Sequence, residues 1–206
     1  MSTKELTLIV ASTNRMGIGK SGSLPWTDGL KKDMAYFARV TKKSDKSARD
    51  PTLQNAVIMG RKTWDSIPAS FRPLKDRVNI VVSRRYKDEI PVIGSGRIFV
   101  NSFDSAVQAS DGCHRVFVIG GAQIYEAALA SKLARRILLT RVLCDFDFDT
   151  RFPLELAENG TTKEGWRRVS HKQLTDWTNE KVSDMILEEN GTKYMFEMWE
   201  KNDRQN

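Results

Sequence analysis

The stretch Asn55–Trp64, NAVIMGRKTW, decides how the chain folds. A continuous apolar run of strand length ends at Gly60, and two cations and a hydroxyl then open a short helical turn. A run without polar alternation is buried on both faces, which is typical of a strand inside a parallel sheet. Exposed amides at the start of the turn attract phosphate, and Arg61 and Lys62 add positive charge. The alternative is a helix-capping turn with incidental basic residues.

The same form recurs along the chain. Strand-sized runs rich in β-branched residues are Leu6–Ser12, Asn55–Met59, Val78–Ser83, Arg97–Val100, Val116–Ile119 and Arg136–Val142. The helical candidates between them are Leu30–Lys43, Lys62–Ser66, Ser102–Ser110 and Gln123–Lys132. Strands that alternate with helices predict an α/β fold, with a central, mostly parallel twisted sheet flanked by helices.

The C-terminal part follows a different pattern. Asn190-Gly191 lies between two strand-like runs, Val182–Glu188 and Tyr194–Trp199, and predicts an antiparallel hairpin that completes an edge of the same sheet. The polar segment Lys42–Thr52 predicts a surface loop rather than a domain boundary. We therefore expect a single domain over residues 1–206.

The composition narrows the function class. The 206 residues are 40% hydrophobic and 29% charged, which is ordinary for a globular enzyme. No apolar run reaches the length of a membrane span, Met1–Glu5 shows no secretory signal, and Cys113 and Cys144 have no metal-like spacing. We expect a cytoplasmic protein without a metal or a membrane partner. The net charge of +7 comes from scattered basic residues, so a nucleic-acid partner is not expected.

The helix expected at Leu30–Lys43 carries an acid on its apolar face. At about 100° per residue one stripe holds Leu30, Met34, Phe37 and Val40, and Asp33 falls inside that stripe. The basic residues that point away from it are Lys31, Lys32, Arg39, Lys42 and Lys43. An unpaired buried carboxylate is strongly unfavourable. Either an internal cation or hydroxyl satisfies Asp33, or Asp33 lines a cavity and binds a ligand; periodicity leaves both interpretations open.

The segment Gly17–Gly22 matches the G-x-G-x-x-G pattern of dinucleotide-binding turns. That pattern binds a dinucleotide where a helix begins at the glycines. Here Ser23–Trp26 follows, and Pro25 disfavours helical geometry at the residue before it. We expect a flexible surface loop that acts as a lid, not a Rossmann turn.

Two further strand ends carry chemistry suited to a cofactor. Val82–Arg85 runs from a strand into a hydroxyl and two guanidinium groups, and Ile119–Ala122 places paired glycines after a buried strand. Because parallel strands end at one edge of a sheet, these turns and Asn55–Trp64 are expected to share a crevice. Two arginine-bearing turns favour a 2′-phosphate, and hence NADP over NAD.

Together these residues resemble the dihydrofolate reductase family along essentially the whole chain. The resemblance rests on the order and spacing of Ile9–Ala11, Gly17–Gly19, Leu24–Trp26, Asp33 with Tyr36-Phe37, Val57–Trp64, Ser66–Pro68, Arg72–Leu74, Arg77, Ser83-Arg84, Ile119–Gly121, Tyr125, Thr140 and Asp149–Pro153. It implies a monomeric, NADPH-dependent reductase of the eukaryotic, fungal branch. Such an enzyme reduces 7,8-dihydrofolate to tetrahydrofolate for one-carbon metabolism and thymidylate synthesis, and binds antifolate inhibitors.

The resemblance also implies roles at the substrate. Asp33 would hydrogen-bond the pterin 2-amino group and N3, with Thr140 as a second contact to that acid. A water under the loop that carries Leu24 and Trp26 would deliver the proton to N5, while hydride passes from nicotinamide C4 to pterin C6. Arg77 would bind the α-carboxylate of the glutamate tail. The other expected substrate contacts are Ile9, Val10, Met34, Phe37, Ile67, Leu74, Ile119 and Tyr125.

For the cofactor, the resemblance implies three groups of contacts. Ala11, Ile18 and Gly19 would meet the nicotinamide end. Lys62 and Thr63 would meet the phosphates, with Arg61, Ser83 and Arg84 near the 2′-phosphate. The strand ends would contribute Gly60, Gly120, Gly121, Ala122, Gln123 and Ile124, and the Gly120-Gly121 peptide would be cis.

Two departures and two rivals accompany this interpretation. Asp33 stands where many eukaryotic members have Glu, and Met34 replaces an aromatic residue of vertebrate members, which leaves a softer wall. A related NADPH-dependent reductase of the riboflavin-pathway type would use the same crevice but has no need for Asp33 together with Arg77. A basic nucleic-acid-binding protein would show salt-dependent RNA binding and no turnover of NADPH.

Overall fold

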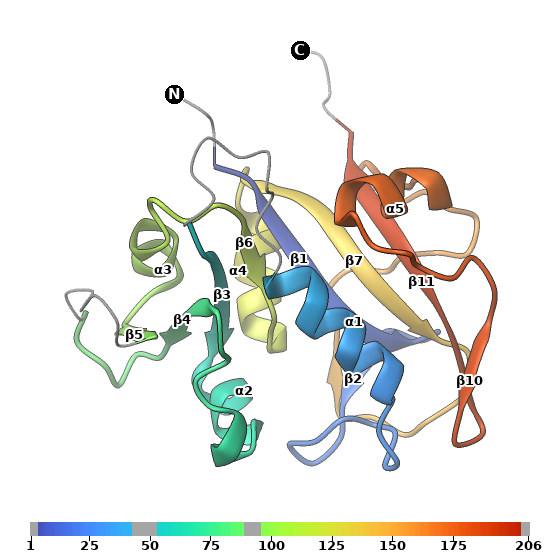
Figure 1. Ribbon diagram of the computed structural model, residues 1–206, viewed down its shortest axis with the longest axis horizontal. Coiled ribbons are helices and arrows are strands. Elements are labelled where there is room, and N and C mark those ends of the chain that lie inside the picture. The colour runs from blue at the N-terminus through green and yellow to red at the C-terminus, as the bar shows by residue number, and fades with distance from the viewer. Residues whose placement is uncertain (1–3, 43–52, 89–95, 203–206) are drawn as a thin grey trace.

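The computed structural model of the protein describes residues 4–42, 53–88 and 96–202, and its centre is a nine-stranded twisted sheet (Figure 1). The strand order is β10-β11-β7-β1-β6-β3-β4-β5, and β9 also pairs with β11. The strands from β7 to β5 are parallel, whereas β9, β10 and β11 form the antiparallel edge. The predicted fold class is confirmed.

The expected strands and helices are present with small changes at their ends. The parallel strands are β1 (Leu6–Thr13), β3 (Asn55–Gly60), β4 (Arg77–Val82), β5 (Arg97–Val100), β6 (Val116–Val118) and β7 (Ala134–Val142). The expected helices are α1 (Lys31–Lys42), α2 (Arg61–Ser66), α3 (Phe103–Ala109) and α4 (Ala122–Ala130), and a 3-10 turn η1 covers Ala69–Phe71. Of the expected loop Lys42–Thr52, residues 43–52 lie outside the described residues.

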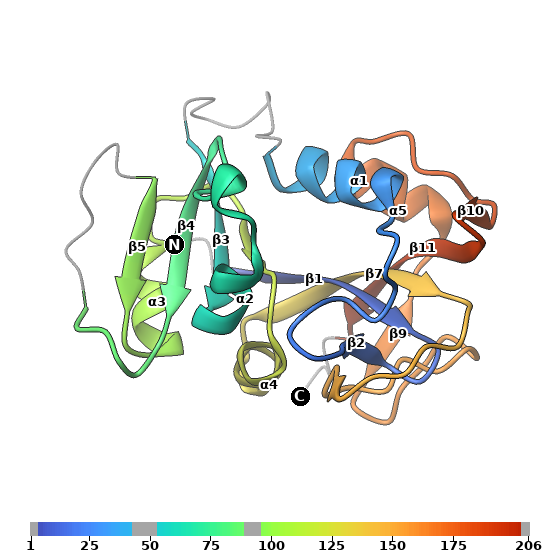
Figure 2. The same ribbon diagram turned by 90° about the horizontal axis from the view of Figure 1, so that it is seen from below.

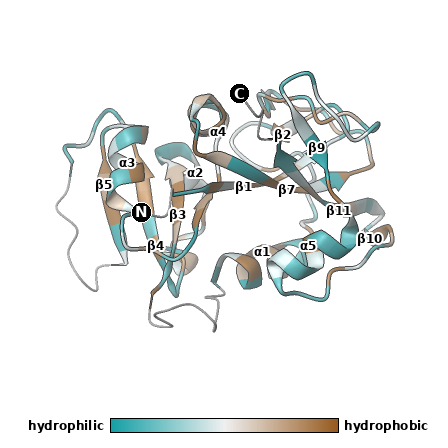
Figure 3. Ribbon diagram, turned by 90° about the horizontal axis from the view of Figure 1, so that it is seen from above, coloured by the Kyte–Doolittle hydropathy of each residue, from teal (hydrophilic) through white to brown (hydrophobic). Residues whose placement is uncertain are grey.

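The helices cover both faces of the sheet (Figure 2). Side chains of α1, α2 and α5 (His171–Thr178) pack with Ile9, Phe117 and Leu138 on one face. Side chains of α3 and α4 pack with Leu8, Ile58 and others on the opposite face. In Figure 3 the hydrophobic residues concentrate in the central strands, and α3 and α5 present hydrophilic residues. Both sheet faces are therefore buried, which explains why the strands lack polar alternation.

The segment Gly17–Gly22 differs in part from its prediction. Gly17–Gly19 forms a short strand, β2, which pairs with β8 (Thr150–Arg151) in a separate two-stranded sheet. The expectation of a loop is thus wrong for these three residues. A Cβ atom at Gly17 would lie 2.3 Å from the Phe148 ring, so glycine is needed for the backbone to approach this ring so closely. The first helix of the described chain begins only at Lys31, so these glycines open no Rossmann turn.

The C-terminal part was predicted less well. The hairpin and its turn are present, but its strands are β10 (Leu187–Glu189) and β11 (Thr192–Lys201), so the expected strand is wrong over residues 182–186. That segment instead packs beside α5, where His171 Nε2 lies 2.9 Å from the Val182 carbonyl. Helix α5 and strand β9 (Trp166–Arg168) were not predicted.

Candidate active site

The carboxylate of Asp33 is buried without a cationic partner. Asp33 lies in the first turn of α1 and is 8% exposed. The Thr140 hydroxyl on β7 donates a hydrogen bond to Asp33 Oδ1 at 2.6 Å, which is the expected contact. Among the described residues, no Lys or Arg nitrogen lies within 4.0 Å of it, so an internal ion pair does not account for its burial. Burial raises the pKa of Asp33 to about 6, against the lowering effect of the Thr140 hydrogen bond.

The buried face of α1 is narrower than predicted. Leu30, Tyr36 and Val40 pack against the sheet, whereas the Met34 side chain is 53% exposed. The expectation that Met34 shares the buried stripe is therefore wrong. An exposed apolar side chain one residue from Asp33 is better suited to contact a ligand than to stabilise the core.

The segment before α1 brings two more predicted residues to this region. The Leu24 side chain is 45% exposed, and Trp26 is buried with its ring 6.3 Å from that of Phe146. The Trp26 Nε1 donor has no hydrogen-bond partner among the residues that the structure describes. A buried donor without an acceptor is costly. Trp26 therefore requires a water or a ligand atom at this place.

Arg77, at the start of β4, is a buried guanidinium held by neutral partners. Its Nη1 donates to the Thr41 hydroxyl at 2.7 Å, and its Nε donates to the Lys75 carbonyl at 3.0 Å. Its Cζ lies 5.8 Å from the centre of the Phe37 ring. No carboxylate of the described residues lies within 4.0 Å of it. Burial lowers the pKa of Arg77 to about 10, against the raising effect of the nearby Asp76 charge, so the guanidinium is charged at neutral pH.

Thr41 is a residue that our sequence reasoning missed. It is fully buried, and its hydroxyl donates to the Phe37 carbonyl at 2.7 Å, which leaves its lone pairs facing Arg77. Phe37, Ile67 and Leu74 are partly buried on this same face of the sheet. Thr41 thus helps to fix the orientation of the Arg77 guanidinium.

The residues of β1 that were expected to contact the substrate have side chains on opposite faces of the sheet. Ile9 lies on the face that α1 covers, whereas the Val10 side chain packs on the α4 face with Tyr125. The Tyr125 hydroxyl donates to the Ile9 carbonyl at 2.7 Å, and burial raises the pKa of Tyr125. The Val10 and Tyr125 side chains therefore lie on the face of the sheet that α4 covers. Ile9 and the partly buried Ala11 and Ile119 lie on the face that α1 covers.

The ends of β3 and β6 meet through their glycines. The Gly60 amide donates to the Gly120 carbonyl at 2.7 Å, and the Gly120-Gly121 peptide is cis, as expected. Gly120 has φ = 112°, which strongly favours glycine, and an added Cβ would lie 3.1 Å from the Tyr125 ring. A Cβ at Gly121 would lie 3.4 Å from the Thr63 hydroxyl. Bare backbone is therefore presented where α4 begins with Ala122, Gln123 and Ile124.

Basic residues follow the ends of β3 and β4, which pair side by side. Lys62 and Arg84 are exposed, and neither forms an ion pair within the described part of the chain. Arg61 is different, because it pairs with Asp65 at 2.6 Å. The Ser83 hydroxyl accepts from the Arg85 amide at 3.3 Å. Unpaired cations beside glycine-rich strand ends fit the phosphates of a dinucleotide.

The segment Ile18–Ser21 is tied to the β8 side of the molecule. The Ser21 amide donates to Asp149 Oδ2 at 2.7 Å, and the Asp149 amide donates to the Gly19 carbonyl at 3.0 Å. Hydrogen bonds from the Ser21 amide and from Thr150 lower the pKa of Asp149. Ile18 is partly buried against the core. This segment therefore has a defined position next to the carboxyl end of β1.

Comparison with known proteins shows which family this chain belongs to. A sequence model described as dihydrofolate reductase matches residues 5–190 of the chain. The chain belongs to the dihydrofolate reductase family. It is 40% identical over 210 residues to the dihydrofolate reductase of Pneumocystis carinii, which covers 95% of this chain and 96% of the relative. It is 37% identical over 206 residues to that of Sus scrofa, with 97% and 99% covered. The solved Schistosoma mansoni dihydrofolate reductase is 35% identical, with a TM-score of 0.75 and coverage of 98% and 100%.

Family membership confirms the predicted family and activity. A dihydrofolate reductase transfers hydride from a nicotinamide cofactor to dihydrofolate, and this reductase has the fold of its relatives. The riboflavin-pathway and nucleic-acid-binding alternatives are therefore set aside. The fungal branch stays a prediction, because fungal and animal relatives match at similar identity.

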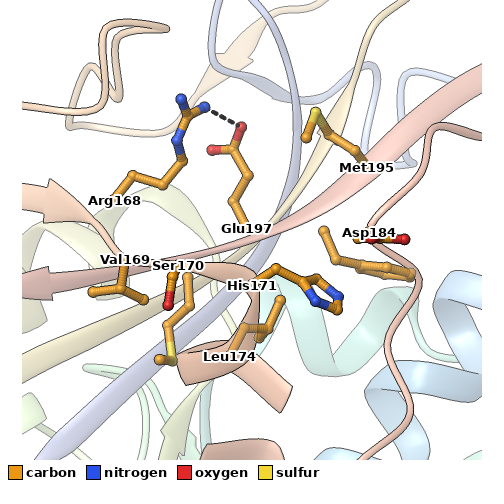
Figure 4. Close-up of a pocket in the computed structure, with 10 residues that line it drawn as sticks. Arg168, Val169, Ser170, His171, Leu174, Asp184, Met195 and Glu197 are labelled. Carbon is orange, nitrogen blue, oxygen red and sulfur yellow. Dashed lines mark hydrogen bonds and ion pairs between the residues drawn. The ribbon is translucent and has the colours of Figure 1, made fainter. Parts of the chain in front are cut away.

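A separate hollow lies beside β11, and Asp33 is not among the residues that line it (Figure 4). It has a volume of about 190 Å³, and its polar lining includes Arg168, Ser170, His171 and Glu197. The Arg168–Glu197 ion pair closes one side of it. None of the predicted site residues of the reductase lines this hollow. Within the described residues, no group of three or more His, Cys, Asp or Glu side chains is placed to hold a metal ion, and no helix is long and apolar enough to cross a membrane.

Proposed function

We propose that this reductase uses NADPH, and that Asp33 is the residue that anchors and orients the pterin ring of dihydrofolate. The observation that carries the proposal is the buried Asp33 carboxylate, which accepts one hydrogen bond from Thr140 and has no cationic partner among the described residues. A 2-amino group and a ring N–H of the pterin are two adjacent donors, which match the two carboxylate oxygens.

The tail of the substrate is assigned to Arg77. Its guanidinium is buried, charged and bonded only to a hydroxyl and a carbonyl among the described groups. A carboxylate is the partner that such a fork binds best. The apolar side chains of Leu24, Met34 and Phe37 lie along α1 and the segment before it, and they are assigned to the aromatic middle of the substrate.

The choice of NADPH over NADH rests on the basic residues after β3 and β4. Lys62 and Arg84 are exposed cations without an acidic partner in the described chain, and bare backbone at Gly60, Gly120 and Gly121 leaves room for close approach. The added charge of a 2′-phosphate is assigned to Arg84 and Ser83. When bound, NADPH supplies the hydride that reduces pterin C6.

Proton delivery to pterin N5 is assigned to a water molecule. Asp33 holds the other side of the ring, so it orients the pterin and favours the protonated form rather than donating to N5. The buried Trp26 Nε1, which has no partner among the described residues, is a donor available to such a water. Orientation and the exclusion of bulk water then account for much of the rate.

The proposal is tested by following the loss of nicotinamide absorbance with the purified chain. We expect oxidation of NADPH only when dihydrofolate is present, with a higher kcat/KM for NADPH than for NADH. The variant Asp33→Asn should bind NADPH normally, lose most activity at neutral pH and recover part of it in acid, where the substrate arrives protonated. Absence of turnover by a folded sample would refute the assignment, and an unchanged rate for Asp33→Asn would make Asp33 merely structural.

Cytoplasmic localisation and a monomeric state are also part of the proposal. Cys113 and Cys144 are free thiols, which suits a reducing compartment. Light scattering of the purified chain and fractionation of cells that produce it are the direct measurements.

A further inference from the structure

The reductase reaction leaves two polar residues of the C-terminal hairpin without a role, Glu189 and Asn190. We propose that the tip of this hairpin positions α1 for catalysis, and that Glu189 and Asn190 act on the substrate through Asp33. Both would be positioning residues, because neither is assigned a contact with substrate or cofactor. The inference rests on the proposed role of Asp33.

Glu189 caps the start of α1 from a distant part of the chain. The first amides of a helix have no partner inside the helix. The Lys32 amide, one residue before Asp33, donates to Glu189 Oε1 at 3.0 Å and to Oε2 at 3.2 Å. A carboxylate at a helix N-terminus is also favoured by the helix dipole. The first turn of α1, which carries Asp33, is therefore held by the end of β10.

Asn190 holds the segment that leads into the helix. Its Nδ2 donates to the Asp28 carbonyl at 3.2 Å and lies 3.5 Å from the Gly29 carbonyl. Asp28 and Gly29 connect Trp26 to α1. The two hairpin residues thus bind on both sides of Leu30, so the angle at which the chain enters α1 is set by the hairpin.

The hairpin is in turn fixed to the strand that carries Thr140. The buried Tyr194 hydroxyl on β11 donates to Glu189 Oε1, and Tyr194 pairs with Val142 on β7. Phe196, which pairs with Thr140, packs against the Tyr36 ring of α1 with centroids 4.3 Å apart. Asp33 is therefore held from two directions, by Thr140 on the sheet and by Glu189 at the helix start.

The charge of Glu189 also acts on Asp33. The groups coupled to the Asp33 carboxyl are Thr140 on β7, Glu189 on β10, Tyr36 on α1 and Tyr194 on β11. None of these is a cation, and Glu189 is the one formal charge among them. After burial, the Glu189 carboxylate is a further cause that raises the pKa of Asp33. Loss of this charge should lower the pKa of Asp33, which a merely structural contact would not do.

The test compares Glu189→Gln with Glu188→Gln in the full chain. Both variants remove one negative charge from β10, but Glu188 is exposed and forms no hydrogen bond or ion pair with α1 among the described residues. We expect Glu189→Gln to lower kcat/KM for dihydrofolate several-fold with the NADPH dissociation constant unchanged. In protein labelled with ¹³C at the Asp carboxyl, with Asp33→Asn for assignment, the Asp33 titration should move to lower pH. Glu188→Gln should change neither quantity.

A second variant separates geometry from charge. Asn190→Gly keeps the turn, in which Asn190 has φ = 50°, but removes the amide that binds Asp28. It should raise KM for dihydrofolate and leave the Asp33 titration in place.

The outcomes distinguish the positioning role of the hairpin from the proposed function of the enzyme. If wild-type protein turns over dihydrofolate and Asp33→Asn loses most of that activity at neutral pH, the proposed function stands. If Glu189→Gln then has the same kcat/KM and the same Asp33 titration as Glu188→Gln, or loses only thermal stability, the positioning role is refuted and the proposed function is not affected. If wild type itself shows no turnover, the proposed function fails first.

Discussion

The buried carboxyl group of Asp33 is assigned to binding the substrate, but its ionised form lowers the stability of the folded protein. Burial, not a charged partner, dominates its environment and raises its pKa from 3.8 to about 6. The folded state therefore binds the proton more tightly than the unfolded state does. The stability that this proton contributes is fully present below about pH 4 and is lost as the pH rises through 6.

The expected result is that Asp33→Asn is more stable than wild type at pH 7. The shift from 3.8 to about 6 corresponds to about 3 kcal/mol, and this advantage should vanish as the pH falls to 4. Urea unfolding at pH 4, 5.5 and 7 measures it. Exposed Asp147→Asn serves as the control and should show little change across the same range. A variant that is less stable at pH 7 would contradict the unpaired state of Asp33.

The short strand β2 offers a prediction at the scale of an element. It is held by β8 and by the Asp149 carboxylate, which accepts from the Ser21 amide. Asp149→Ala removes this acceptor and should speed hydrogen exchange over residues 17–23, because the local opening becomes easier. Mass spectrometry of the exchanged protein measures it, with Asp147→Ala as the control. Equal exchange in the two variants would mean that backbone pairing alone holds the segment.

Elements defined by local patterns were predictable from the sequence. The buried strands are visible in the sequence as apolar runs. The helices α1 to α4 are predicted by the patterns of the segments between those runs. Helix α5 was missed although Ser170 and Gln173 form a capping box, a signal that was available. The strand expected at 182–186 was wrong because its polar and apolar alternation has no strand to pair with there.

Active-site residues were predictable from the sequence where a side chain is unusual for its position, such as an acid on an apolar helix face. Asp33 stood out as an acid on an apolar face, whereas Thr41 and Glu189 gave no such signal. Their partners lie 36 and 157 residues away in the sequence, at Arg77 and Lys32. A hydroxyl or an exposed acid is ordinary in its own segment, and only the fold brings it to its partner.

At the scale of the whole molecule, one buried ionic network joins the antiparallel edge to the parallel sheet. Arg141 on β7 binds Glu197 on β11 through two hydrogen bonds of 2.8 and 2.9 Å. Arg168 on β9 and the Trp199 indole donate to the same carboxylate. Although burial raises the pKa of Glu197, the hydrogen bond and charge of Arg141 hold it below its ordinary value.

Glu197→Gln should therefore destabilise the protein by about 3–5 kcal/mol at neutral pH, because it leaves the buried Arg141 guanidinium without its counter-ion. Since the pKa of Glu197 is lowered, its contribution is present at neutral pH and is lost as the pH falls through the folded-state value. Urea unfolding measures both effects. Glu200→Gln, which removes a partly exposed acid from the same strand, should cost less than about 1 kcal/mol. Equal costs would show that the network adds nothing to stability.

The capping of α1 by Glu189 also has a consequence for the order in which the enzyme is made. Every residue assigned to the cofactor lies before residue 125, so a growing polypeptide acquires all of them while the hairpin is still untranslated. The Asp33 helix at that stage lacks the carboxylate that binds the Lys32 amide, 157 residues further along the chain. With the positioning role proposed for Glu189, competence toward dihydrofolate is gained only after the hairpin has been made. A polypeptide released early would hold the cofactor-binding residues without a correctly seated pterin anchor.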